Sequence, residues 1–180
     1  MSADDRIRPP AASPRYAAEV DPGDMGNLTP AELVEQLNML LEAERAGVRV
    51  AAALVGEAPN PDLKLTAFQL RRDEAHWCHV LSEALIRMGE KPSAKVGDFY
   101  HKAMAIPGFE ARLAFVNRGQ GWVVRKLRAL LPRVADAGLH SELRAMLDGH
   151  AENIAFAERA LRRAGGAPGS GSALANRSAP

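Results

Sequence analysis

The sequence predicts an all-α protein, a single antiparallel up-down bundle of four helices. Ala, Leu, Glu and Arg dominate the composition and aromatic residues make up only 5%, a bias that favours helix over sheet. Apolar residues recur at helical spacing in four long segments. These segments have similar lengths and are joined mostly by short polar links, which is typical of up-down bundles.

The first predicted helix begins after Thr29. Thr29 can cap the helix, Pro30 suits its first position, and Glu32 completes a capping box. Gly56 and the Pro-Asn-Pro run at 59–61 end it. Its apolar row has helical spacing and consists of Leu33, Leu37, Leu40, Leu41, Val48, Ala51 and Val55.

The second predicted helix covers 63–88, and Gly89 lies where such a helix stops. The link over 92–107 that follows is long for a bundle and contains a short helical piece over 98–105. The sequence leaves open whether this link is a lid or a packing spacer. The core row of the second helix consists of Thr66, Leu70, Trp77, Leu81, Ala84, Leu85 and Met88.

The third and fourth predicted helices cover 109–131 and 139–164. Pro132 stops the third because its ring cannot continue a helix. Gly165 follows the fourth and is expected to stop it.

The chain divides into one domain and two ends. Its 180 residues suggest a single domain, the bundle over 29–164. Residues 1–28 carry four scattered prolines without periodicity, which predicts a disordered or loosely packed N-terminal arm. Residues 165–180 are rich in Gly, Ala and Ser, which predicts a flexible C-terminal tail. We expect both ends to be solvated, with docking to a partner as the alternative.

Charge and cysteine content exclude several classes. The chain has 23 basic and 22 acidic residues, so we expect no nucleic-acid partner, which would normally require a basic excess. The single cysteine, Cys78, fits a reducing cytosol. The N-terminus lacks a signal-peptide pattern, and no run reaches the ~18 apolar residues of a membrane helix. We therefore expect a cytoplasmic protein without a membrane partner.

Polar residues interrupt the apolar stripes of three helices. Glu44 lies four residues after one core leucine and four before a core valine. On the second helix, Asp73 and Glu74 flank the core line, and His76 follows Asp73 by one turn. His150 is central on the fourth helix. An unpaired buried carboxylate costs several kcal/mol, so these residues need a cation, a proton or hydrogen bonds.

The third helix carries amides instead of acids. Asn117 and Gln120 lie among its apolar residues, and Asn153 lies one turn after the core histidine of the fourth helix. These three predict a polar network in the core. Gly119 and Gly121 each cost ~1 kcal/mol relative to Ala in a helix interior, so we expect a close backbone approach, a kink or a bulge there.

Each of these residues also has a structural interpretation. A single core histidine is more often hydrogen-bonded than a metal ligand, and the two amides of the third helix can satisfy each other and the backbone. Glu44 can pair with an arginine, and the candidates are Arg45, Arg72, Arg118 and Arg125.

Together the polar residues resemble the metal centre of the ferritin-like superfamily. Its di-iron members take one Glu from the first helix, Glu-x-x-His from the second, one Glu from the third and Glu-x-x-His from the fourth. The resemblance spans 29–164. Glu44 matches the first acid, Asp73 and His76 match the second motif with Asp in place of Glu, and His150 matches the last histidine.

The chain departs from that pattern on its last two helices. Leu147 occupies the position of the fourth-helix acid, and Asn117 or Gln120 that of the third-helix acid. The run 115–127 also resembles that of an uncharacterised bacterial family of ferritin-like domain proteins, which implies a fold but no activity.

The resemblance implies a degenerate, mononuclear metal site in the bundle core. Two irons need several anionic ligands, which this sequence lacks. Iron or manganese is the expected metal, and zinc suits the same donors. The expected ligands are Glu44, Asp73, His76 and His150, with Glu74 and Glu110 as further candidates.

The alternative is a non-enzymatic bundle with a buried polar network and no metal. Such a bundle would have a structural role or bind a partner, either a second copy or another protein, through its surface or its arms. A nucleophilic enzyme using Cys78 with His76 or His79 is disfavoured, because residues one or two apart on a helix do not face each other. The sequence gives neither a substrate nor an activity.

Overall fold

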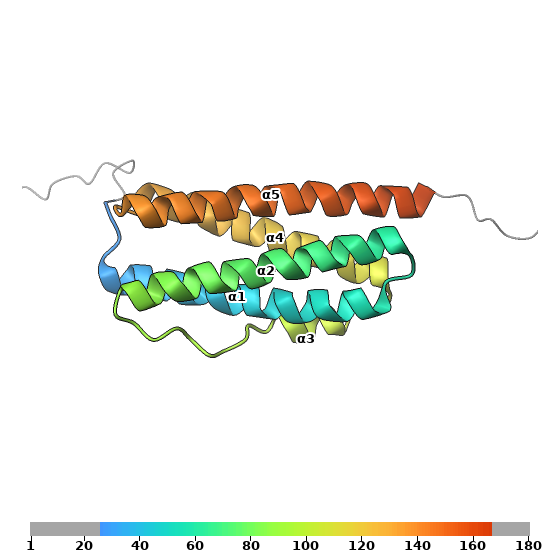
Figure 1. Ribbon diagram of the computed structural model, residues 1–180, viewed down its shortest axis with the longest axis horizontal. Coiled ribbons are helices and arrows are strands. Elements are labelled where there is room, and N and C mark those ends of the chain that lie inside the picture. The colour runs from blue at the N-terminus through green and yellow to red at the C-terminus, as the bar shows by residue number, and fades with distance from the viewer. Residues whose placement is uncertain (1–25, 167–180) are drawn as a thin grey trace, which may run out of the picture.

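The structure, a computed structural model, describes residues 26–166, and all regular secondary structure in that range is helical (Figure 1). This confirms the all-α prediction for the described residues. Four long helices lie side by side, and a short one packs beneath them (Figure 1). In chain order the elements are α1 Pro30–Glu57, α2 Pro61–Arg87, α3 Phe99–Met104, α4 Phe109–Leu130, the 3-10 turn η1 Leu131–Arg133, and α5 Ala137–Gly166.

The starts of α1 and α2 are set by capping side chains. Thr29 N donates to the Glu32 carboxylate at 2.8 Å, and Glu32 N donates to the Thr29 hydroxyl at 3.3 Å, so the predicted capping box is confirmed. Asn60 accepts from Leu63 N at 2.9 Å. Because Asn60 caps and Pro61 takes the first position, α2 begins two residues earlier than predicted.

The helix ends agree less well with the sequence. Gly89 has a φ of 80° and follows the end of α2, as predicted. α4 ends at Leu130, and the chain continues through Pro132 as a 3-10 turn. α5 continues to Gly166, so Gly165 does not stop it, and the first two residues of the predicted tail are helical. Most of the predicted arm and tail, residues 1–25 and 167–180, lies outside the described residues.

Contacts at the two ends of the bundle give the helix directions. At one end, Glu57 at the close of α1 pairs with Arg112 near the start of α4. At the other end, Leu28 N, just before α1, donates to Arg133 O, just after α4, at 3.0 Å. α1 and α4 are therefore antiparallel.

The second pair of neighbouring helices from different hairpins behaves in the same way. Arg87 closes α2 and pairs at 2.6 Å with Glu142 near the start of α5. Within each hairpin the two helices are antiparallel, α1 to α2 and α4 to α5. Since α1 is also antiparallel to α4, α2 and α4 run in the same direction, and the order along the chain is up, down, down, up (Figure 1). The strict up-down alternation predicted from the sequence is wrong. The reason is the segment 88–108, which travels the length of the bundle instead of turning back.

This crossover is fixed along α1. Arg45 donates to Ser93 O, and Ser93 N donates to Asn38 Oδ1 at 2.8 Å. Farther along, Gly97 N donates to Glu42 O at 3.0 Å. The crossover then lays α3 against α1 and α4. The first half of the segment is therefore hydrogen-bonded to α1 and acts as a packing spacer. The sequence had left open whether this link is a lid or a spacer.

Gly119 on α4 allows α3 to approach closely. A Cβ at Gly119 would lie 2.7 Å from the Phe99 ring, which real side chains do not tolerate. The close approach expected at this glycine is thus found. Gly121 has no such role, because a Cβ there would meet only the Arg125 side chain, at 3.6 Å.

The hydrophobic core has two halves. One half is centred on leucines near the start of α1 and on Trp77, and the other surrounds Val50, Leu54 and Leu63. None of the described helices is both long and apolar enough to span a membrane.

Candidate metal centre

A layer of polar side chains separates the two halves of the core, and each long helix contributes one residue to it. Every contributor has apolar residues of one half on its N-terminal side and of the other half on its C-terminal side. All four are buried, between 0% and 5% exposed. They are Glu44 on α1, Glu74 on α2, Gln120 on α4 and His150 on α5.

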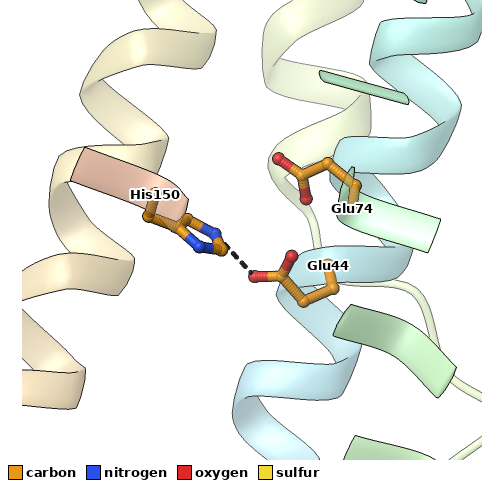
Figure 2. Close-up of side chains that lie close together, drawn as sticks. All are labelled: Glu44, Glu74 and His150. Atoms are coloured by element: carbon orange, nitrogen blue, oxygen red, sulfur yellow. Dashed lines mark ion pairs between the residues drawn. The ribbon is translucent and has the colours of Figure 1, made fainter. Parts of the chain in front are cut away.

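Three of these side chains point into one space (Figure 2). Glu44, Glu74 and His150 each offer a ligand atom, and these atoms lie within 4.8 Å of one another. Among the described residues this is the one such group of three acids, histidines or cysteines. It joins α1, α2 and α5.

Glu44 and His150 lie closest to one another. His150 Nε2 is 3.2 Å from Glu44 Oε1 (Figure 2). The two groups are not aligned for a hydrogen bond, and neither Glu44 oxygen nor His150 Nε2 has a hydrogen-bond partner in the described part of the chain. Such unpaired buried atoms are rare and costly.

The other ring nitrogen of His150 fixes its tautomer. His150 Nδ1 is 2.9 Å from Met146 O. A carbonyl only accepts, so Nδ1 carries the hydrogen and donates it. In the neutral ring, Nε2 then presents a lone pair towards Glu44. Metal-binding histidines commonly have this arrangement, in which one nitrogen donates to a backbone carbonyl and the other faces the ion.

Glu74 is held from two sides. The Gln120 amide donates to Glu74 Oε1, which fixes the carboxylate from α4. On the other side, Gly47 of α1 leaves the space that the carboxylate occupies, since a Cβ on Gly47 would collide with it. Both contacts turn Glu74 towards Glu44.

The surroundings disfavour charge on both carboxyl groups. Burial raises the pKa of Glu44 from 4.5 to about 8, and the adjacent Glu74 carboxyl group reduces this rise in part. The pKa of Glu74 is raised well above its usual value, first by burial and then by the charge of Glu44, with His150 acting in the opposite direction. The two acids therefore need protons or a cation.

The arginines that the sequence offered to Glu44 lie elsewhere. Arg45 donates to the crossover, Arg72 pairs with Asp73, and Arg118 lies 5.3 Å over the Phe115 ring. Arg125 is exposed. Within the described residues, the ion-pair partner of Glu44 is His150.

Two of the predicted ligands do not reach this group. Asp73 is half-buried and pairs with Arg72 at 2.9 Å, and His76 is exposed, with its ring centre 4.5 Å from that of Trp77. The expectation that Asp73 and His76 meet Glu44 is wrong. Glu74, given only as a further candidate, takes the place of both.

The reason is that the prediction placed the core-facing side of α2 one residue too early in the sequence. Leu70, Glu74, Trp77 and Leu81 follow one another by four, three and four residues, which is the stripe that faces the core. Asp73 and His76 each precede a member of that stripe by one residue and so point roughly 100° away. The spacing of Glu74 was the signal that could have identified it.

The remaining predicted residues divide between the site and its surroundings. Glu110 is exposed at the start of α4, away from the group. Asn117 donates to Ile154 O at 3.1 Å rather than to Gln120. Asn153 is buried at 9% exposure, one turn after His150 on α5. Of the predicted amide network, Gln120 belongs to the site.

Cys78 is a poor nucleophile. Burial, and then the charges of Glu44 and Glu74, raise the pKa of its thiol from 9.0 to about 12. The reactive species is the thiolate, so this shift argues against cysteine chemistry.

A pocket of about 520 Å³ reaches the polar layer from the side of α1 and α4. Glu44, Glu74 and Gln120 line its inner end, whereas His150 does not contribute. The two carboxylates are thus the part of the group that a molecule in this pocket would meet.

Comparison with known families gives one match. The model of a family described as a domain of unknown function (DUF6306) matches residues 31–169. No curated protein matches the chain.

Proposed function

The chain belongs to the DUF6306 family, and on the geometry of its core we propose that it is a ferritin-like bundle that holds one divalent metal ion. The proposed ligands are Glu44, Glu74 and His150, and the proposed ion is iron(II) or manganese(II).

One observation carries the proposal. Both oxygens of Glu44 and Nε2 of His150 are buried, face the same space, and lack hydrogen-bond partners among the described residues. A lone pair and carboxylate oxygens that face one another repel unless a proton or a cation lies between them. A divalent ion would pair with all three ligands and offset the charge of both carboxylates.

The donor set supports the choice of metal. Two carboxylates and one imidazole suit Fe(II), Mn(II) or Zn(II), and Cys78 lies outside this group of possible ligands. His150 would be oriented by Met146 O, and Glu74 by the Gln120 amide. Such supporting hydrogen bonds are typical of metal ligands.

The corrected face of α2 also sharpens the ferritin-like resemblance. Glu44 and Glu74 fall at the acids of the first and second helices, and Trp77 stands where the second-helix histidine would be. Gln120 falls at the third-helix acid. His150 keeps the last histidine while Leu147 replaces its acid. The remaining ligands support one ion rather than two.

The helix order supports the same relationship. Ferritin-like bundles contain one long crossover connection between their two hairpins. Here the segment 88–108 is such a crossover. When bound, the metal would be held by Glu44, Glu74 and His150 and would supply Lewis-acid or redox chemistry. The chain's own residues would hold it and exclude water from His150.

Metal analysis of purified protein tests the proposal. Protein loaded anaerobically with Fe(II) or Mn(II) should retain about one equivalent after desalting. Glu44→Gln and His150→Asn should lose it. Asp73→Asn and His76→Asn, on the outer side of α2, are matched controls that should retain it. A content below about a tenth of an equivalent, unaffected by His150→Asn, would rule out the site.

A specific observation favours a second candidate, the polar network without metal. With a pKa of about 8, Glu44 is protonated near neutrality, and this proton would relieve the repulsion between its carboxylate and the lone pair of His150 Nε2 without a metal ion. The bundle would then have a structural or partner-binding role. In that case a chelator would leave the melting temperature of the purified protein unchanged. If a metal ion is bound, its removal by the chelator would lower the melting temperature.

A further inference from the structure

Three elements form the walls of the pocket beside the candidate metal centre, and α2 adds Glu74 at its inner end. α1 contributes Met39 and Ala43, α4 contributes the face from Phe115 to Val123, and the crossover contributes Phe99 of α3. Its volume of about 520 Å³ is within the usual range for sites that take small organic molecules. The chain thus forms a side chamber of ligand size, separate from the two packed halves of the core.

The walls of this pocket are apolar and partly aromatic. Phe99 and Phe115 stack with their ring centres 4.9 Å apart at an angle of 11°, so α3 and α4 present one continuous aromatic surface. The lining also includes Met39, Val116, Trp122 and Val123. Walls of this kind favour a hydrocarbon or aromatic body.

Basic side chains lie on the outer part of the pocket. Arg118 of α4 and Lys102 of α3 both line it and are both exposed. The Arg118 guanidinium lies 5.3 Å over the Phe115 ring, which holds it against the wall. Two acids also lie here: Asp98 is exposed, and Glu42 accepts a hydrogen bond from the Ser93 hydroxyl of the crossover.

We propose that this pocket binds a small amphipathic anion, with an aromatic or branched hydrocarbon body and one carboxylate or sulfonate group. The body lies between the aromatic wall and Val116, and the anionic group lies near Arg118 and Lys102. The inner end, formed by Glu44, Glu74 and Gln120, has no basic side chain to pair with an anion, so the molecule enters with its apolar end first. The claim that this molecule is the substrate of the metal centre rests on the proposed function. The claim that it binds in the pocket does not.

Two fluorescent probes test the proposal on the full chain. 8-Anilinonaphthalene-1-sulfonate has the required body and an anionic group, and N-phenyl-1-naphthylamine has the same body without the charge. We expect both to bind at one saturable site and to quench Trp122, which lines the pocket. Trp122→Phe should abolish the quenching while the probe emission remains.

Two pairs of variants locate the site. Ala43→Phe should fill the pocket and abolish binding of both probes. Ala52→Phe, the same change at an exposed position of α1, should leave binding unchanged. Arg118→Gln should weaken the binding affinity for the anionic probe roughly fivefold, as expected for the loss of one partly exposed ion pair, and should leave the affinity for the neutral probe unchanged. Arg125→Gln, on the same helix but outside the pocket, is its control.

Failure of this proposal is distinguishable from failure of the metal site. His150 does not line the pocket, so His150→Asn should lose the metal and keep both probes. If neither probe saturates, or Ala43→Phe binds as Ala52→Phe does, the pocket is not a ligand site whatever the metal content. If Arg118→Gln leaves the affinity for the anionic probe unchanged, the proposal that the ligand carries an anionic group near Arg118 is wrong. Circular dichroism on each variant, together with the surface change Arg118→Gln, guards against misfolding.

Discussion

The carboxylate of Glu74 on α2 occupies the space that a side chain on Gly47 of α1 would fill. A Cβ added to Gly47 would collide with both carboxyl oxygens. Gly47 is one turn from Glu44 on the same helix, so the glycine lets the second acid approach the first. The two carboxylates of the candidate site therefore depend on a residue that is itself unable to bind anything.

Replacing Gly47 by alanine should disrupt the site. The Glu74 carboxylate is the flexible end of its side chain and would turn away, so we expect metal affinity to fall by about 10–100-fold, as for other residues that support metal ligands. Isothermal titration of the metal-free protein measures this.

Gly121→Ala is the control, because a Cβ there has room. It should raise the unfolding free energy by about 1 kcal/mol through helix propensity and leave metal binding unchanged. Equal metal affinity in Gly47→Ala and the wild type would contradict the role given to Gly47.

The metal-free protein should become less stable as the pH rises. In the unfolded chain Glu44 has a pKa near 4.5, and in the folded protein it is about 8. Between these values the folded state holds a proton that the unfolded state lacks. This contribution is fully present below pH 4.5 and is lost as the pH rises to 8, with a slope of up to about 1.4 kcal/mol per pH unit.

Urea unfolding in the presence of chelator, at several pH values from 5 to 8, measures that slope. Glu44→Gln should flatten it, because the amide does not titrate. Metal affinity should change in the opposite direction and rise with pH, since the ion displaces protons. A metal-free protein whose stability is constant over this range would show that Glu44 titrates normally.

Gln120→Glu should separate the effects of charge and metal. A third buried acid beside Glu74 should lower the unfolding free energy of the metal-free protein by about 1–3 kcal/mol, because a buried charge is left unpaired. With metal present, the added carboxylate should raise affinity roughly tenfold. Titration calorimetry and unfolding of both forms give the two values.

Asn117→Asp is the matched control for this change. Asn117 lies on the same helix and donates to Ile154 O, away from the ligands. Its replacement should lower stability without raising metal affinity. A gain of affinity in both variants would point to a general effect of negative charge.

Cys78 should be resistant to alkylation in the folded protein. With the thiol pKa at about 12 rather than 9.0, the thiolate fraction at pH 8 falls by about 100–1,000-fold. Iodoacetamide labelling, followed by mass spectrometry, should therefore be slow in buffer and fast in urea. Rapid labelling of the folded chain would indicate an accessible thiolate.

Much of the fold follows from local sequence signals. Thr29 and Glu32 set the first helix start, and Gly89 sets one helix end, because capping depends on neighbouring residues alone. The direction of α4 does not follow in this way. It depends on whether the segment 88–108 turns back or crosses the bundle, and that is decided by distant contacts such as those of Ser93 with α1.

The inward-facing polar residue was identified on α1 and α5 but misassigned on α2. Glu44 and His150 are single polar residues centred on apolar stripes, so their orientation is unambiguous. On α2, Asp73, Glu74 and His76 lie together at the edge of the stripe, and a rotation of one residue decides which faces inward. The spacing of Glu74 from Leu70 and Trp77 favours the inward position, and the space at Gly47 of α1 accommodates its carboxylate there.

The crossover divides the chain into two helical hairpins, 30–87 and 109–166, each built from contacts between neighbours in sequence. Glu44 and Glu74 belong to the first, and Gln120 and His150 to the second. Each hairpin can form rapidly by itself, but the polar layer exists only after the two dock. Docking is then the folding step that removes two carboxyl groups from water, and an ion held across the seam would slow their separation. The rate at which the two hairpins separate during unfolding would therefore depend on whether the ion is bound.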